Sequence, residues 1–295
     1  MIVDLEAMTA EVPADKVRRT LAAIEKAMAD EWVSAKDLQS LLGLLGFVGQ
    51  VLVSGRWRVP WTIVAMRMAM KSGYSPMNGW WLEELQWWSD LLNKWNRVSM
   101  ILNPELLIPL HSADVAPFTD ASGGEANGGA GAVFGKYWMA FLFTKEELAV
   151  LPICDLEGVV SVLWLAEVCQ RWPEQIAGRR FLAWCDNTTF VDCVNNHKSA
   201  APSLAYLLLV LHDLMARYSF EIRLKYVKSE ENVAADAASR EEWDKFYTFM
   251  ESVGFPRADL VRIPVQEEAR RSITSEMMSR RLLKKGMLKE QKPVG

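Results

Sequence analysis

Apolar residues in the first hundred positions recur every three or four residues, a spacing that places them on one face of a helix. The pattern begins after Pro13 and returns in residues 35–52 and 78–95, and Pro104 then interrupts it as in a linker. It predicts a helical region over residues 1–104.

Three glycines lie three residues apart in the second of these helices, at positions 43, 46 and 49. Glycines at this spacing leave a strip without side chains along one face of a helix. We expect this strip to let a neighbouring helix approach closely.

From residue 115 the pattern changes to short apolar stretches, which are typical of strands. VAPFTDAS, GAGAVFGK and YWMAFLF are separated by Gly-rich or tight turns and predict a three-stranded meander. An amphipathic helix is expected over 155–172, strands over 179–187 and 220–227, and further helices over 188–196, 203–218 and 232–240. This order predicts an α/β domain over residues 105–245, with a mixed five-stranded sheet and flanking helices. Residues 246–295 would form a C-terminal extension.

The composition is that of a folded protein, with 51% hydrophobic and 24% charged residues in a chain of 295. The acidic start, MIVDLEAMTAE, lacks the basic and apolar runs of a secretory signal. No apolar stretch has the ~18 residues needed to span a bilayer. We therefore expect no membrane partner, and a cytoplasmic or nuclear location.

The net charge of −4 is unevenly distributed. Residues 105–265 are acidic, whereas residues 266–295 carry more basic than acidic side chains. The end of this stretch, SRRLLKKGMLKEQKPVG, is typical of a basic, frayed helix or tail. An acidic domain cannot attract a polyanion through its overall charge. Nucleic-acid binding would need metal ions, a local basic strip or the tail.

Tryptophan is abundant in the helical region, with pairs such as Trp80-Trp81 and Trp87-Trp88. At helical spacing these side chains form either a core or a surface for a protein partner. The four cysteines form no CxxC pair and read as small buried hydrophobic residues.

Four acidic residues occupy unusual positions. Asp120 and Asp186 each end an apolar strand, and Glu157 lies in the first turn of the helix over 155–172, on its apolar side. Asp236 lies among alanines in a short helix. Several carboxylates buried together must share protons or bind cations. Oxygen ligands favour Mg²⁺ or Mn²⁺, and such a set can hold two ions for attack on a phosphodiester.

The segments TDAS…GAGA, LEGVVSVLWLAEVCQRW, CDNTTFVDCVNN and SEENVAADAASR resemble the four motifs of retroelement ribonuclease H domains. The resemblance is to tyrosine-recombinase retrotransposons in particular. VDLEAMTAEVPADKV and SAKDLQSLLGLLGFVGQVLVSGR resemble the thumb and connection region of the reverse transcriptases of these elements. The resemblance covers residues 1 to about 240.

This resemblance implies a ribonuclease-H-like sheet preceded by a reverse-transcriptase remnant. It gives Asp120, Glu157, Asp186 and Asp236 the places of the metal-binding, catalytic carboxylates. Asn187 and Asn232 match neighbouring positions of the family that contact the nucleic-acid strand or have a structural role. The implied activity is Mg²⁺-dependent endonucleolytic hydrolysis of the RNA strand of an RNA–DNA hybrid.

Two features depart from the family. The chain contains no Asp-Asp pair, so the polymerase palm with its Tyr-x-Asp-Asp signature is absent and no polymerase activity is expected. The family usually has a His-x-Pro-Gly turn ten residues before the last Asp. Tyr226 stands here in place of that histidine, which is thought to assist product release.

Basic residues near the expected site could contact phosphates. Lys225 and Lys228 are the nearest in sequence, and Arg56 and Arg58 flank Trp57 in the helical region. An alternative to the nuclease is a domesticated, non-catalytic scaffold that binds a protein partner through the Trp-rich helical region. The missing palm and Tyr226 favour the scaffold, and the complete set of four carboxylates favours the enzyme.

Overall fold

The computed structural model describes residues 1–7, 9–100, 110–111, 118–123, 128–177, 180–199, 201–218 and 220–290. The linker expected around Pro104 lies outside these residues. The chain divides into two compact units. The first comprises Met1–Asn103, Lys198–Ala205 and Leu283–Gly295, and the second comprises Pro104–His197 and Tyr206–Leu282.

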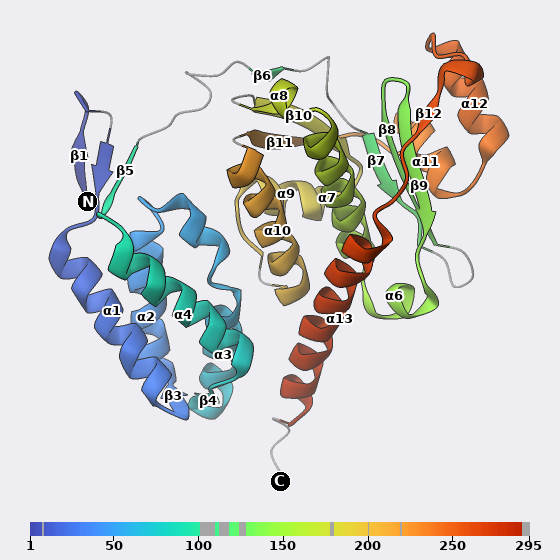
Figure 1. The fold of residues 1–295 in the computed structure, drawn as a ribbon. Coiled ribbons are helices and arrows are strands. Elements are labelled where there is room, and N and C mark those ends of the chain that lie inside the picture. The colour runs from blue at the N-terminus through green and yellow to red at the C-terminus, as the bar shows by residue number, and fades with distance from the viewer. Residues whose placement is uncertain are drawn as a thin grey trace. The chain divides into compact units, whose positions relative to one another are not determined.

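The first unit is helical, as the sequence predicts (Figure 1). Its helices are α1 (Ala14–Ala29), α2 (Ala35–Val48), α3 (Pro60–Ser72) and α4 (Gly79–Lys94), with a 3₁₀ turn over Val53–Trp57. Short strands accompany them: β1 (Ile2–Asp4), β2 (Thr9–Glu11) and β5 (Val98–Met100) form one sheet, and β3 (Trp32–Ser34) pairs with β4 (Tyr74–Pro76). Helix α3 was missed in the sequence, although Pro60 occupies a position that favours a helix start.

Tryptophan side chains form much of the core of this unit. Trp61, Trp81 and Trp88 are at most 1% exposed. Glu84 is buried with them and accepts hydrogen bonds from the backbone N–H groups of Trp61 and Thr62, both at 2.9 Å. A carboxylate on the free N–H groups of a helix start is favourable, so Glu84 fastens α4 to the beginning of α3. Most of the tryptophans are therefore used for packing inside the unit.

The expected glycine strip of α2 is not used for close packing. Gly43 and Gly46 are exposed, and a Cβ added at either would meet no described atom within 4 Å. Only Gly49 is buried, where the Arg56 side chain covers it. The expectation was wrong for the first two glycines because spacing alone does not show which face of a helix is buried.

The second unit contains a mixed sheet in the order β11-β10-β7-β8-β9-β12, with β6 also paired to β10. Its strands are β6 (Leu110–His111), β7 (Phe118–Ala121), β8 (Gly129–Phe134), β9 (Tyr137–Leu142), β10 (Arg180–Cys185), β11 (Glu221–Tyr226) and β12 (Val261–Arg262). The predicted α/β class is correct, and the five expected strands occur in the expected order. The sheet is larger than expected because β12 and β6 add to it, each with only two residues.

Strands β7, β10 and β11 run parallel to one another, as does the short β6, and this aligns the carboxyl ends of β7 and β10. Trp184 and Cys185 of β10 pair with Phe118 and Thr119 of β7. Asp186 directly follows Cys185, and Asp120 directly follows Thr119. The register therefore brings the two aspartates to the same end of the sheet. Strand β11 pairs with the other side of β10, where Tyr226 is opposite Cys185.

Helices flank the sheet (Figure 1). They are α6 (Lys145–Val150), α7 (Ile153–Arg171), α8 (Pro173–Ile176), α9 (Thr188–Asn195), α10 (Pro202–Tyr218), α11 (Val233–Ser239), α12 (Trp243–Ser252) and α13 (Glu267–Glu290). Helix α7 was expected to be amphipathic, but every residue from Asp155 to Cys169 except Ala166 is buried. A helix that is apolar on all sides is a central one, so the carboxyl group of Glu157 is held inside the unit.

Helix α11 packs so closely against β8 that no side chain fits between the two backbones at Gly131. A Cβ added to Gly131 would lie 2.2 Å from the carbonyl oxygen of Ala235 and 2.7 Å from the backbone nitrogen of Ser239. Ser122 reinforces this contact, because its hydroxyl donates to the Ser239 carbonyl at 2.9 Å. The glycine therefore sets the position of the helix that carries Asp236 and Ser239.

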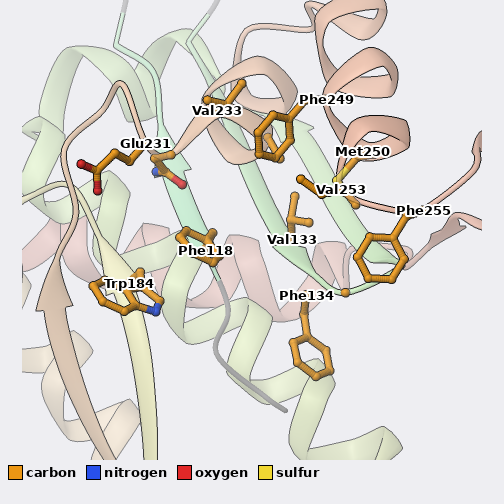
Figure 2. Close-up of a pocket in the computed structure, with 13 residues that line it drawn as sticks. Phe118, Val133, Phe134, Trp184, Glu231, Val233, Phe249, Met250, Val253 and Phe255 are labelled. Atoms are coloured by element: carbon orange, nitrogen blue, oxygen red, sulfur yellow. The ribbon is translucent and has the colours of Figure 1, made fainter. Parts of the chain in front are cut away.

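Helix α12 belongs to the same unit as the sheet. Phe246 and Met250 are at most 2% exposed and pack with Val133 and Trp138 of the sheet. The residues after 245, expected as an extension, thus complete a hydrophobic cluster over this face. Beyond this cluster, α12 and the sheet leave a pocket between them (Figure 2).

Helix α13 is firmly attached, at least as far as residue 282. Arg270 is 4% exposed, and its Nη1 lies 2.6 Å from Oε1 of the buried Glu147. Farther along, Arg281 lies 3.8 Å from the buried Asp155. Residues 279–290, which belong to the stretch expected as a basic, frayed helix or tail, are helical, and Arg281 of this stretch pairs within the chain.

No helix among the described residues is long and apolar enough to cross a membrane.

Two glycine substitutions test this packing. Gly131→Ala should lower the free energy of unfolding by about 1–3 kcal/mol, because the methyl group meets the backbone of α11. Gly46→Ala should raise it by about 0.5–1 kcal/mol, because its site in α2 is open and alanine favours the helix. Urea unfolding followed by circular dichroism measures both. Equal stability of the two variants would contradict the described contact of α11 with β8.

Candidate functional site

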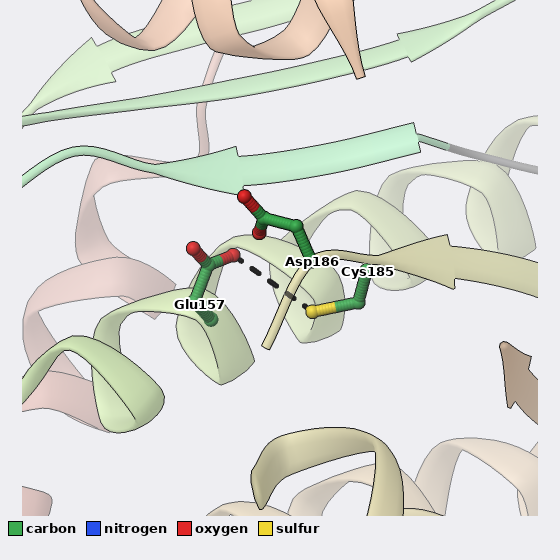
Figure 3. A group of neighbouring side chains, drawn as sticks. All are labelled: Glu157, Cys185 and Asp186. Atoms are coloured by element: carbon green, nitrogen blue, oxygen red, sulfur yellow. Dashed lines mark hydrogen bonds between the residues drawn. The ribbon is translucent and has the colours of Figure 1, made fainter. Parts of the chain in front are cut away.

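Three of the four predicted carboxylates meet at the aligned ends of the parallel strands. Asp120 is the third residue of β7, Asp186 follows β10, and Glu157 projects from α7. One oxygen of Glu157, one oxygen of Asp186 and the sulfur of Cys185 all lie within 4.8 Å of one another. Figure 3 shows the carboxyl groups of Glu157 and Asp186 close together, with the Cys185 thiol beside them.

Cys185 belongs to this cluster although the sequence analysis set it aside. It is fully buried, its Sγ lies 3.9 Å from Oε2 of Glu157, and the Asn187 N–H donates to it at 3.4 Å. Burial and the neighbouring Glu157 charge raise the pKa of this thiol well above its ordinary value. The thiol therefore stays protonated and donates to the carboxylate in the absence of a metal. The only signal for it was its place directly before Asp186.

Asp120 is 3% exposed, and the hydroxyl of Ser239 donates a hydrogen bond to its Oδ2. Burial raises the pKa of Asp120 to about 7. The Ser239 hydrogen bond opposes this rise, and the charges of Asp186 and Asp236 add to it. Asp120 therefore keeps its proton to a higher pH than an exposed aspartate does.

Glu157 has the same difficulty in a stronger form. It is 2% exposed, and burial followed by the charges of Asp120 and Asp186 raises its pKa well above the ordinary value. A hydrogen bond from the Ala121 backbone only partly offsets the rise. None of the ion pairs among the described residues involves Asp120, Glu157 or Asp186.

The donor set fits a divalent cation. Asp186 accepts a hydrogen bond from Ser229 on Oδ2 at 3.0 Å, while its Oδ1 is buried and has no hydrogen-bond partner among the described residues. A buried oxygen without a donor is costly, and a cation would satisfy it. Carboxylate oxygens suit Mg²⁺ or Mn²⁺, and the Cys185 sulfur adds a softer donor.

Asp236 is engaged differently. Its Oδ1 lies 2.7 Å from Arg240 and its Oδ2 lies 3.0 Å from Lys245. Burial would raise its pKa, but these two cations lower it below the ordinary value. Its charge still acts on Asp120. The structure thus places Asp236 near the other three carboxylates, with both oxygens already paired, and the sequence did not reveal Arg240 or Lys245 as its partners.

The two predicted asparagines support the site. Asn187 accepts a hydrogen bond from the Phe190 N–H at 3.1 Å and so begins α9 directly after Asp186. Asn232 is 1% exposed, and its Nδ2 donates to the carbonyl of Thr119 at 3.0 Å. This bond joins the start of α11 to the strand residue before Asp120.

The predicted basic residues lie in two places. Lys225 and Lys228 are exposed in the second unit, and the Lys225 ammonium lies 5.7 Å from the centre of the Trp184 ring. Arg56 and Arg58 belong to the first unit, where Arg56 donates to the Gly49 carbonyl at 2.8 Å and Arg58 lies 4.8 Å from the Trp87 ring. The Arg56 and Arg58 contacts to nucleic acid stay predictions.

No protein-family model matches the chain, and no curated protein matches it significantly. The function therefore has to be argued from the motifs and from the geometry of this cluster.

The raised pKa of Asp120 predicts how stability depends on pH. In chelator-treated protein, the unfolded Asp120 ionises near its ordinary value of 3.8, whereas the folded one keeps its proton to about 7. The contribution of Asp120 to stability should therefore fall as pH rises between these values, and the raised pKa of Glu157 should add to the fall. Thermal melting from pH 4 to 8 measures this fall.

The matched variants are Asp120→Asn and Asp259→Asn. The first removes the titrating group and should reduce the loss of melting temperature between pH 4 and 7. The second changes an exposed aspartate of the same unit and should leave the profile as it is. An unchanged profile in Asp120→Asn would show that the Asp120 pKa is not raised.

Proposed function

We propose that the second unit is a Mg²⁺-dependent ribonuclease H, which hydrolyses the RNA strand of RNA–DNA hybrids. The observation that carries this proposal is the cluster of the buried Asp120 and Glu157 with the half-buried Asp186, all three outside every ion pair found among the described residues. Three such carboxyl groups are costly in an empty site and useful in one that binds cations. A purely structural role would not require this cost.

The chemistry follows from the arrangement of ligands. Two bound ions would activate a water molecule for attack on a phosphodiester and stabilise the leaving oxygen. Asp120, Glu157 and Asp186 would hold these ions, and Ser229 and Ser239 would orient the two aspartates through their hydrogen bonds. The aligned ends of β7 and β10 keep the ligands in place before any substrate binds.

Asp236 is the proposed fourth ligand and must first be released. Its oxygens are paired with Arg240 and Lys245. These partners are half exposed, with side-chain exposures of 50% and 47%, and exposed ion pairs contribute only about 0–1 kcal/mol. Replacing the two side-chain cations with a metal ion would therefore cost little free energy. The freed Arg240 and Lys245 could then contact phosphate.

The choice of an RNA–DNA hybrid rests on the resemblance of the four motifs to retroelement ribonuclease H domains. The shape of such a hybrid and its 2′-hydroxyl groups would select the RNA strand. Lys225 and Lys228, exposed on and after the strand next to β10, are the proposed phosphate contacts.

The second candidate function is a non-catalytic scaffold. Two observations favour it: Asp236 is paired in the manner of a structural residue, and Tyr226 replaces the histidine of the family. The burial of Trp61, Trp81 and Trp88 weakens the Trp-rich region as the surface for its partner. Trp32, at 60% exposed, is the tryptophan that such a surface would use.

Asp186→Asn should abolish Mg²⁺-dependent cleavage of a labelled RNA–DNA hybrid while the protein remains folded. The amide keeps the shape of the side chain but loses the charge that holds the metal. The control is Asp192→Asn, an exposed residue of α9 that should cleave like the wild type.

Mg²⁺ should also raise the melting temperature of the wild type and of Asp192→Asn, and raise that of Asp186→Asn less. Cleavage by Asp186→Asn at the wild-type rate would refute its assigned role. Absence of both cleavage and metal stabilisation in the wild type would favour the scaffold.

Tyr226→His should raise multiple turnover by roughly tenfold without changing affinity for the hybrid. Tyr226 is 48% exposed beside Cys185, and the loop that follows it reaches Asp186 through Ser229. Histidine titrates near neutral pH and can move a proton, which contributes about 10²–10⁴ in favourable cases. Steady-state cleavage at matched Mg²⁺ measures the effect, with Tyr226→Phe as the control that should gain nothing. Equal rates for histidine and phenylalanine would place the side chain out of reach of the reaction.

A further inference from the structure

A pocket of about 670 Å³ lies between the sheet and α12 in the second unit. Figure 2 shows Phe118 and Trp184 at one end and Phe249, Val253 and Phe255 at the other, with Val133 between them. Pockets of this volume with mostly apolar walls and a few polar groups are typical binding sites for small molecules or single groups of a larger one.

Flat rings are already arranged for stacking at the end formed by the strands. The Phe118 and Trp184 rings are nearly parallel, 8° apart in orientation, with centres separated by 6.1 Å. The Lys225 ammonium lies 5.7 Å from the centre of the Trp184 ring. An aromatic ligand that stacks here can therefore have an anionic group beside Lys225.

One wall of the pocket contains an oxygen atom that lacks a hydrogen-bond donor among the described residues. Asn232 lines the pocket, is 1% exposed, and uses its Nδ2 to hold the Thr119 carbonyl. Its Oδ1 is buried and accepts no hydrogen bond from the described residues. An entirely apolar ligand would leave this oxygen unpaired, at a cost of about 1–3 kcal/mol. A ligand that offers an N–H group removes that cost.

The pocket also has a fixed relation to the carboxylate cluster. Phe118 precedes Asp120 by two residues, and Trp184 precedes Asp186 by two. Two residues of a strand span about 6.6 Å, a distance that one sugar-phosphate unit can bridge. A base held by Phe118 and Trp184 would therefore be linked to a phosphate near the cluster.

We propose that this pocket binds a nucleobase that carries an amino group, stacked on Phe118 and Trp184 and hydrogen-bonded to Oδ1 of Asn232. The inference rests on the proposed function only in naming the nucleic acid, and it adds a subsite that takes an unpaired base next to the cleaved phosphate. The same chemistry could be offered by a base of a strand or by a free nucleotide, and the experiment separates the two.

The test uses the full chain with a chelator, so that no strand is cleaved. The probe is a short single-stranded oligonucleotide that contains 2-aminopurine, whose fluorescence falls when its base stacks on aromatic rings. The wild type should quench this fluorescence. Val253→Phe should bind at least tenfold more weakly, because Val253 lines the pocket and is 49% exposed, so a larger side chain can fill the pocket without disturbing the core.

Ser252→Phe is the matched control. Ser252 is the exposed neighbour of Val253 and does not line the pocket, so this variant should quench like the wild type. Equal binding by Val253→Phe and Ser252→Phe would overturn the proposal, and so would the absence of quenching by the wild type.

Competition experiments test whether the amino group of the base is needed for binding. They also test whether the bound base belongs to a free nucleotide or to a strand. Adenosine monophosphate should displace the probe better than purine riboside monophosphate, which lacks the amino group, and equal competition would remove the role of Asn232. Displacement at similar concentrations of mononucleotide and unlabelled strand supports a free nucleotide as ligand, whereas displacement by the strand alone supports a base within a strand.

Since these measurements need no metal, loss of hybrid cleavage with intact quenching would reject only the proposed ribonuclease activity. Cleavage without quenching would reject only the pocket.

Discussion

The burial of Asp120 and Glu157 beside the half-buried Asp186 is the constraint on which the second unit depends. The negative charges of Asp120 and Asp186 raise the pKa of Glu157, and those of Asp186 and Asp236 raise the pKa of Asp120. The surrounding structure compensates locally through hydrogen bonds from Ser239, Ser229 and the Ala121 backbone. The parallel pairing of β7 with β10 brings Asp120 and Asp186 together, since it fixes both strand ends in one register.

The helices of this unit are positioned around that register. Helix α7 is buried on nearly all sides and so cannot turn Glu157 toward solvent. Helix α11 approaches β8 at a distance that only a glycine at position 131 allows, and this brings Ser239 onto Asp120. Asn232 then ties the beginning of the same helix to the strand residue before Asp120. Packing and site geometry are therefore set by the same contacts.

The sequence predicted those parts of the site that depend on local pattern. Asp120 and Asp186 could be found because each ends an apolar strand, and the strand order placed them together. Cys185 was missed because a cysteine in an apolar strand looks like a core residue, and its contact with Glu157 comes from another element. The pairing of Asp236 with Lys245 likewise depends on a turn between two helices. Strand β12 was missed because two residues carry no periodicity.

The buried pair of Arg270 and Glu147 also bears on how the chain is made. The two residues are 123 positions apart, and Arg270 lies in α13, which follows every strand of the sheet in the sequence. Until α13 has emerged, the carboxylate of Glu147 has neither Arg270 nor Thr274 as a partner. Helix α6, which carries Glu147, can therefore reach its final packing only after α13 has been synthesised, and nascent chains that stop before residue 270 would be substrates for chaperones and proteases.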